Sequence, residues 1–241
     1  MLELWHEWNS VHSFKVRVTL AEKGLQWVDR RLELLKFEHL RPAYLRLNPG
    51  GVVPTLVHDG QAVMESSVIC QYIDEAFVEP ALLPPVALGR ARCRAWLKYF
   101  DDVVHPPIRR ASFELLYRPQ LARMTRSELR ERLLAHPDSA RAEAFMKAAE
   151  SIGDPRVLAD SIKTFERIIV RIEQGLEGND WLSGSVFGLA DVAMAPFVER
   201  LDSLSLNELW TLPQGRAWAD RVMRRPAIAH SRPPSLYRLF C

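Results

Sequence analysis

Cysteine is scarce in this chain of 241 residues, which contains only three. They are Cys70, Cys93 and Cys241. An odd number without a C-x-x-C pair excludes a disulfide framework, and the spacing does not fit a set of metal ligands. We therefore expect reduced thiols and no bound metal.

Long apolar runs are missing as well. The longest, residues 189–198, is interrupted by Asp191 and Pro196 and falls short of the ~20 residues that span a bilayer. The start of the chain has neither the basic residues nor the apolar run of a signal peptide. We predict a cytoplasmic protein that does not cross a membrane.

The chain has no large excess of positive or negative charge. The 32 Lys and Arg residues nearly balance the 30 Asp and Glu residues, for a net charge of +2. Proteins that bind nucleic acid through its phosphates need a strong basic surplus, so no nucleic acid partner is expected. With 48% hydrophobic and 26% charged residues, the composition is typical of a globular chain with a sizeable core.

Proline marks a boundary between two parts of the chain. Pro80, Pro84 and Pro85 fall within six residues, a density that neither a helix interior nor a central strand accepts. The sequence therefore predicts one domain over residues 1–79, a linker over 80–87 and a second domain over 88–241.

The first part alternates between strand and helix patterns. Alternating residues predict strands over 2–5, 27–34, 55–58 and 62–64, and helical texture predicts helices over 14–23, 39–47 and 65–77. Asp59-Gly60 is the turn of a hairpin between the last two strands. The order, βαβ followed by αββα, predicts a small α/β unit with a mixed sheet.

The second part has helical patterns almost throughout. They predict helices over residues 88–117, 157–176, 189–201 and 214–224, the first kinked at Pro106-Pro107. Thr125 and Glu128 have the spacing of a capping box that opens a further helix. Residues 118–155 are too long for a simple connection, so we interpret them as an inserted helical segment.

The loop Asn9-Ser10-Val11-His12-Ser13 lies between the first strand and the first helix. Its hydroxyls can simply cap the helix by accepting backbone N–H bonds. The same unpaired N–H groups and the positive end of the helix dipole also favour an anion, including a thiolate. Spacing alone leaves both interpretations open.

Three further motifs have a structural and a functional interpretation. Val53-Pro54 can be a plain turn, or a cis peptide that leaves the Val53 backbone free to pair with an extended peptide. Glu65-Ser66 can cap a helix, or can bind the ammonium and carboxylate of an α-amino acid head group. Asp191 can be an active-site base, but we interpret it as a structural capping acid at the start of an apolar helix.

Taken in order, these motifs resemble the cytosolic glutathione transferases. They comprise a Ser-bearing loop after the first strand, N-P-x-G-x-V-P, E-S-S at a helix start, a proline-rich linker, and a helical half with L-A-D and R-P-A-I. The resemblance covers nearly the whole chain, from about Leu2 to Ile228. It implies an α/β thioredoxin-like N-terminal domain with a mixed sheet, an all-α C-terminal domain, glutathione as co-substrate and a homodimer.

The resemblance also implies site residues. Ser10 matches the catalytic serine of serine-type members, His12 falls where some bacterial members have a thiolate-binding Asn, and Ser13 is the alternative in an alignment with bacterial lignin β-etherases. The lysine often found just before V-P is Val52 here, which leaves His39 and Lys36 for the glycyl carboxylate. The remaining glutathione-binding residues implied are Val53, Pro54, Glu65 and Ser66.

The electrophile is expected between the two domains. By position, the residues expected to surround it are Trp8, Asn9, Val11, Tyr99, His105, Arg109 and Phe113, although aromatic residues at helical spacing are commonly core. The resemblance implies attack of the glutathione thiolate on an electrophile, with aryl ether cleavage as the leading specific reaction. Alternatives are a glutathione-dependent thiol–disulfide oxidoreductase, which the serine at position 10 disfavours, and a non-catalytic glutathione-binding regulatory protein.

Overall fold

The computed structural model describes residues 1–150 and 154–237. Its N-terminal part contains β1 (Leu2–His6), α1 (Val11–Glu22), β2 (Val28–Arg31), α2 (Pro42–Leu45), β3 (Thr55–His58), β4 (Gln61–Val63) and α3 (Ser66–Ala76). The four strands form one sheet in the order β2-β1-β3-β4, with β1 parallel to β2 and the other neighbours antiparallel. The predicted mixed sheet is confirmed. Cys241, expected to be a free thiol, lies outside the described residues.

The predicted helix over residues 39–47 is the main error in this part. A 3-10 turn over Glu38–Leu40 is followed by the short α2 instead. Pro42 explains the break, because the residue before a proline is held away from the helical region. Arg41 is accordingly extended, with φ −67° and ψ 142°.

The C-terminal part is helical, as predicted. A nearly continuous helical rod runs through α4 (Ala87–Tyr99), α5 (His105–Ser112) and α6 (Arg118–Leu121). After it come α7 (Arg126–Leu133), α8 (Ser139–Glu150), α9 (Pro155–Gly175), α10 (Leu189–Ser203), α11 (Pro213–Met223) and α12 (Pro226–Ser231). No helix in the described ranges is long and apolar enough to cross a membrane.

The rod contains two wider turns rather than one sharp kink. Single π-helical turns over Phe100–Val104 and Phe113–Tyr117 separate its three α-helical stretches. Each lies just ahead of prolines, Pro106-Pro107 in one case and Pro119 in the other. A proline has no N–H to donate to the carbonyl four residues earlier, and its ring crowds that carbonyl. A π turn changes the hydrogen-bond spacing from four residues to five, which relieves this conflict ahead of the proline.

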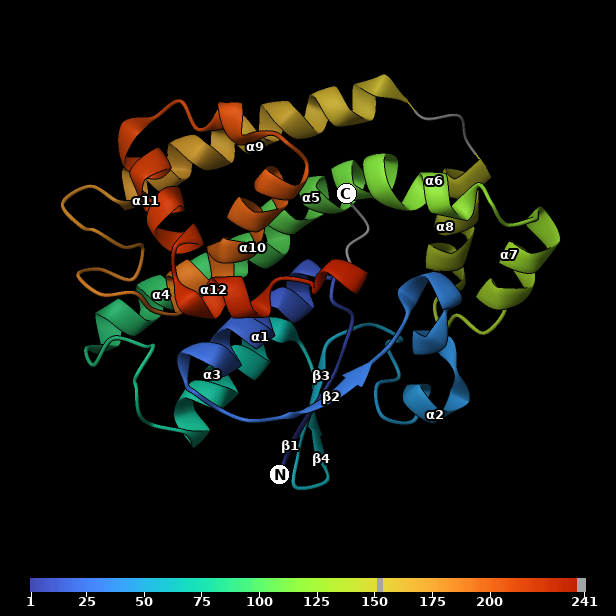
Figure 1. Cartoon of the computed structure of the whole chain (residues 1–241), viewed down its shortest axis with the longest axis horizontal. Coiled ribbons are helices and arrows are strands. Elements are labelled where there is room, and N and C mark those ends of the chain that lie inside the picture. Colours follow the sequence, from blue (N-terminus) through green and yellow to red (C-terminus); the bar gives the residue numbers. More distant parts are fainter. Residues whose placement is uncertain (151–153, 238–241) are drawn as a thin grey trace.

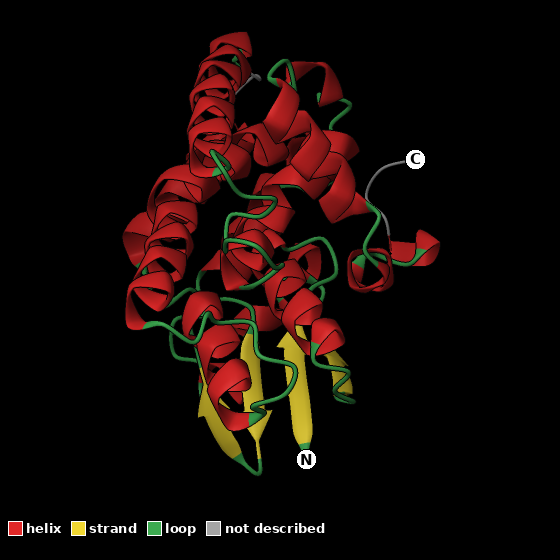
Figure 2. Ribbon diagram, turned by 90° about the vertical axis from the view of Figure 1, so that its left-hand side faces the viewer, coloured by secondary structure: helices red, strands yellow, loops and turns green. Residues whose placement is uncertain are grey.

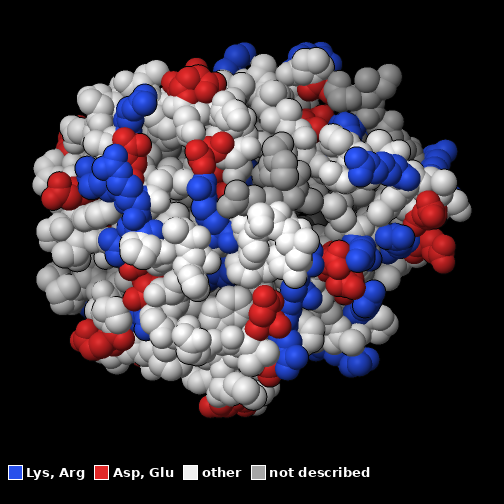
Figure 3. All heavy atoms as spheres, in the orientation of Figure 1, with Lys and Arg blue, Asp and Glu red and all other residues white. Residues whose placement is uncertain are grey.

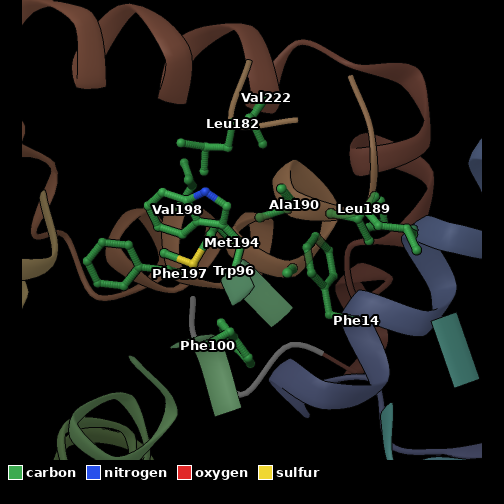
Figure 4. Packing of buried hydrophobic residues seen from close by; sticks show 14 of the residues in the cluster. Phe14, Trp96, Phe100, Leu182, Leu189, Ala190, Met194, Phe197, Val198 and Val222 are labelled. Atoms are coloured by element: carbon green, nitrogen blue, oxygen red, sulfur yellow. The ribbon is translucent and has the colours of Figure 1, made fainter. Parts of the chain in front are cut away.

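The two parts meet along α1 and α10. In Figure 1 the strands lie below, α1 and α3 cover the sheet, and the helical part lies above them; Figure 2 shows the same layers from the side. Every residue from Leu189 to Leu201 on α10 is buried. Figure 4 shows Met194 and Phe197 of this helix clustered with Trp96, Phe100 and the α1 residue Phe14.

Asp191 opens α10 and is fully buried. Its carboxylate accepts hydrogen bonds from the N–H groups of Leu182, Ser183 and Gly188 and from the Trp218 indole, at 2.8–3.2 Å. Because three of these bonds come from the loop ahead of the helix and the fourth comes from Trp218 of α11, Asp191 has the predicted structural role.

The inserted segment forms its own small core with the N-terminal part. Buried Leu121, Leu129 and Leu133 pack against Phe37 and Leu40 from the stretch between β2 and α2. In Figure 1, α6–α8 accordingly stand beside this stretch, away from the rest of the helical part. Thr125 and Glu128 form the predicted capping box.

Candidate functional site

A cavity of about 570 Å³ lies between the two parts. Most residues expected to bind glutathione or an electrophile line it: Asn9, Ser10, Val11, His12, His39, Val53, Pro54, Glu65, Ser66, His105, Arg109 and Phe113. One wall therefore comes from the N-terminal loops and helix starts, and the other from α5 and the inserted segment.

Ser10 is the N-cap of α1 and faces this cavity. Its backbone is extended, with φ −77° and ψ 123°, and its hydroxyl oxygen accepts the Ser13 N–H at 3.2 Å. Because that bond uses a lone pair, the hydroxyl proton remains available to donate. Capping therefore leaves the Ser10 hydroxyl able to donate a hydrogen bond into the cavity.

Four of the expected residues lie outside the cavity: Trp8, Ser13, Lys36 and Tyr99. Ser13 is fully buried beneath the first turn of α1. Lys36 is largely exposed and pairs with Glu33 at 2.9 Å. The sequence pattern could not separate these residues from the cavity-lining ones, because neighbours one or two positions apart on a helix or turn face different sides.

Trp8 and Tyr99 are each held elsewhere. The Trp8 ring stacks under the Arg17 guanidinium, whose carbon lies 4.5 Å from the ring centroid. Tyr99 lines a separate cavity of about 460 Å³ between α4 and α9, together with Trp96 and Arg171. The rod therefore faces the first cavity only from α5 onward.

The turn before β3 is cis at Val53-Pro54, which decides between the two interpretations that the sequence left open. Tyr44 and Asn48 hold it from behind, because the Tyr44 hydroxyl bonds the Val52 carbonyl at 2.6 Å and the Asn48 amide bonds it at 3.0 Å. Among the described residues, none hydrogen-bonds the backbone of Val53. Its N–H and C=O are thus available to a bound chain.

Gly51 makes this turn possible and ties it to the inserted segment. Its φ is +57°, and a Cβ there would lie 3.0 Å from Leu40 and 3.4 Å from Pro137. A side chain would strain the backbone and crowd both neighbours. The glutathione-binding turn expected from the motif therefore touches the insertion directly.

The start of α3 forms the third element of the cavity wall. Glu65 has a φ of +64° and an exposed side chain, and Ser66 follows it as the first helical residue. The Ser66 hydroxyl bonds His12 Nδ1 at 2.9 Å. This bond joins the starts of α1 and α3, which each direct N–H groups toward the cavity.

A buried network fixes these two helix starts to the helical part. Lys15 Nζ of α1 bonds Ser67 at 2.7 Å and Asp101 at 3.0 Å, and Ser67 bonds the same carboxylate at 2.6 Å. The His12 ring also lies against His105, with ring centroids 4.1 Å apart. The two walls of the cavity are therefore linked by polar contacts as well as by apolar packing.

Arg200 is a cavity residue that the sequence did not reveal. It lies on α10, is buried, and donates to Asn9 O and Ser112 Oγ, both at 2.7 Å. It thereby fixes the loop that carries Ser10 to α5. Within an apolar helical stretch, a single arginine gave no signal of this distant pairing.

The far wall of the cavity is aromatic. Phe145 of α8 stands edge-on to Phe113 and to Phe37, with ring centroids 5.5 Å and 5.8 Å apart. Tyr117 and His136 line the same wall. Apart from Phe113, the sequence did not point to these residues, because they come from the end of the helical rod, from the inserted segment and from a loop, whose packing against one another was unknown.

Behind the Ser10 loop, two buried polar side chains are hydrogen-bonded to each other. Arg17 donates to His6 Nδ1 at 3.1 Å, so the neutral His6 ring carries its proton on Nε2 and donates it to Asp29 at 2.9 Å. Burial lowers the pKa of His6 to about 4, against the opposing effect of the Asp29 hydrogen bond. Among the described residues, no cluster of three or more His, Cys, Asp or Glu could hold a metal ion.

Comparison with known families identifies the class of protein. The glutathione S-transferase N-terminal domain matches residues 9–76, and the glutathione S-transferase C-terminal domain matches residues 140–227. The chain belongs to the glutathione S-transferase family and has its fold, a thioredoxin-like domain followed by a helical domain. Members of this family are enzymes that use glutathione as co-substrate.

Individual relatives are more distant. Protein LigF of Sphingobium sp. strain SYK-6 is 28% identical over 235 residues, covering 94% of this chain and 91% of that protein. The crystal structure of beta-etherase LigF matches with a TM-score of 0.84 and 26% identity, over 95% of this chain and 98% of that one. A theta class glutathione S-transferase from Xanthomonas axonopodis pv. citri, solved with glutathione bound, shares the fold at a TM-score of 0.73 and 21% identity, covering 98% of both chains.

Proposed function

We propose that this transferase joins the sulfur of glutathione to an electrophilic carbon that carries an aryloxy group. The observation that supports this most is the shared cavity, in which a helix start bearing Ser10 faces an aromatic wall across the domain boundary. Similarity to a beta-etherase along nearly the whole chain supports the choice of an aryl ether.

Ser10 is the residue we assign to the sulfur. A free thiol has a pKa of about 8.5, and lowering it by about 2 units takes on the order of 2.7 kcal/mol of preferential thiolate stabilisation. A hydroxyl donating to a charged sulfur contributes about 1.5–3 kcal/mol, and the start of α1 adds about 0.5–1 kcal/mol. Together they suffice to hold the sulfur as a thiolate at neutral pH.

The rest of glutathione would lie along the N-terminal wall. The cysteinyl amide pairs with the free backbone of Val53, and the γ-glutamyl head meets Glu65 and Ser66, which offer an acceptor for its ammonium and donors for its carboxylate. His39 lines the cavity and serves the glycyl carboxylate, whereas Lys36 lies outside it. These remote contacts fix the sulfur for reaction.

An oxidoreductase is less consistent with the thiols that the structure describes. Cys70 and Cys93 are both buried. Burial raises the pKa of the Cys70 thiol to about 11 and also raises the pKa of Cys93. Because the thiolate is the reactive form, neither cysteine is suited to disulfide exchange.

Turnover of a substrate panel tests the proposal. Aryl ethers, chlorodinitrobenzene and mixed disulfides would each be incubated with glutathione, and products identified by mass spectrometry. We expect a glutathione thioether and a free phenol from the aryl ether. Disulfide reduction alone would favour the oxidoreductase, and glutathione binding without any turnover would favour a regulatory protein. The homodimer and the cytoplasmic location stay predictions.

A further inference from the structure

Tyr117 is a cavity residue with a hydroxyl group that the fold does not use. It ends the second π turn, lines the cavity on the helical side and is partly buried. Among the residues that the structure describes, none forms a hydrogen bond with this hydroxyl. Tyrosine hydroxyls removed from bulk water normally have a partner, so a substrate that displaces water from the cavity is expected to supply one.

The position of Tyr117 suits the end of the electrophile away from the sulfur. Phe113 lies one turn earlier on the same wall, and both pack against the aromatic and aliphatic cluster of the inserted segment. Ser10 belongs to the opposite wall. An aryloxy group seated against Phe113 would thus place its ether oxygen near the Tyr117 hydroxyl, on the side of the attacked carbon opposite the sulfur.

The electrostatic surroundings keep this phenol protonated. Burial raises the pKa of Tyr117, although the nearby Arg200 guanidinium opposes the shift and the Glu7 carboxylate adds to it. The group is therefore a donor at neutral pH. Arg200, held by Asn9 and Ser112, is close enough to stabilise negative charge that develops on or near this hydroxyl.

We propose that the Tyr117 hydroxyl donates a hydrogen bond to the ether oxygen of the substrate as the carbon–oxygen bond breaks. This inference rests on the proposed aryl ether reaction. The glutathione sulfur forms a bond to the carbon, the carbon–oxygen bonding pair moves onto the oxygen, and the oxygen takes the Tyr117 proton and leaves as a phenol. Tyr117 regains a proton from water, which received the one lost by the glutathione thiol.

Tyr117→Phe with two matched substrates tests this role. Phenacyl aryl ethers and phenacyl bromide share the attacked carbon and the neighbouring carbonyl, and differ only in the group that leaves. We expect the variant to lower kcat for the aryl ethers by about 10- to 100-fold and to change the rate with the bromide less than about twofold. Across ethers of increasing phenol pKa, the rate should fall more steeply in the variant than in the parent enzyme.

Controls separate this role from a structural one. The hydroxyl has no partner among the described residues, so Tyr117→Phe should keep the melting temperature of the parent. Tyr72→Phe removes a phenol hydroxyl that bonds His58 at 2.6 Å, outside the cavity, and should leave the ratio of ether to bromide rates unchanged.

Three results would overturn the inference. An equal loss with both substrates would place the hydroxyl on the carbonyl, and no loss with either would remove it from the reaction. A parent enzyme that converts the bromide but none of the ethers would contradict the proposed substrate class and this role together, whereas either of the first two results would contradict this role alone.

Discussion

Replacing Ser10 by alanine is the most direct test of how the sulfur is activated. The change removes one hydroxyl that has two functions, since it accepts the Ser13 N–H at 3.2 Å and keeps its own proton for the cavity. The first function stabilises α1, and the second would stabilise a thiolate. The two losses can be measured separately.

The chemical loss follows from the strength of one hydrogen bond. A bond to a charged acceptor contributes about 1.5–3 kcal/mol, and about 1.4 kcal/mol corresponds to one pKa unit. Ser10→Ala should therefore raise the pKa of bound glutathione by about 1 to 2 units. From a bound pKa near ~6.5, the thiolate fraction at pH 7 then falls by about 4- to 40-fold, and kcat falls with it.

The pH dependence gives the sign of the effect. In the variant, bound glutathione is mostly the unreactive thiol at neutral pH. The variant's rate should therefore rise with pH by about tenfold per unit until the new, higher pKa of the thiol is passed. The pKa of bound glutathione itself can be read from the ultraviolet absorbance of the thiolate. Ser10→Thr, which keeps a hydroxyl and a cap, should remain near the parent in both measurements.

The structural loss is expected to be small. Removing an N-cap costs about 1 kcal/mol, which for a chain of this size lowers the melting temperature by about 2–4 °C. If Ser10→Ala left both the thiol pKa and the rate unchanged, Ser10 would not be the donor. If Ser13→Ala produced the loss instead, the role would belong to that buried hydroxyl.

Two further predictions concern the residues behind the site. Tyr44→Phe removes the bond to Val52 O, so the KM for glutathione should rise by about three- to tenfold while kcat changes little; a fall in kcat at constant KM would contradict the binding role of this turn. Burial lowers the pKa of His6 to about 4 in the folded protein, below its value in the unfolded chain. The free energy of unfolding should therefore decrease as the pH falls from about 6.5 to 4, by about 2 kcal/mol between pH 7 and pH 5. Urea unfolding of the parent and of His6→Gln checks this, because the variant should show a flatter pH dependence; identical slopes would exclude His6 as the cause.

The elements with strong local signals could be predicted from the sequence. Alternation fixed the strands to within a few residues, and Asp59-Gly60 placed the hairpin turn. Caps were informative as well, since Thr125 and Asp191 lie at the starts of the helices where they were expected, whereas α1 begins at Val11, three residues before its predicted start. In all these cases the determining contacts lie within a few residues along the chain.

The far wall of the cavity could not be predicted in the same way. Phe37, Phe145 and Tyr117 come from three separate segments, and only packing between the inserted segment and the N-terminal part brings them together. Arg200 is a similar case, because its partners lie far away in the chain. Periodicity reports which face of a helix is apolar and does not report which distant element covers it.

Most residues that could be predicted lie on the wall proposed to bind glutathione, and most that could not be predicted lie on the wall proposed to bind the electrophile. The wall that would hold glutathione is built from helix starts and a cis-proline turn, whose geometry depends on local sequence and suits one constant co-substrate. The opposite wall is built from Phe113 and Tyr117 at the end of the helical rod and from Phe145 of the inserted segment. These side chains pack in a small core separate from that of α10 and the sheet, so they can change without disturbing either. Specificity for the electrophile is therefore expected to reside in Phe113, Tyr117 and Phe145, and sulfur activation in Ser10.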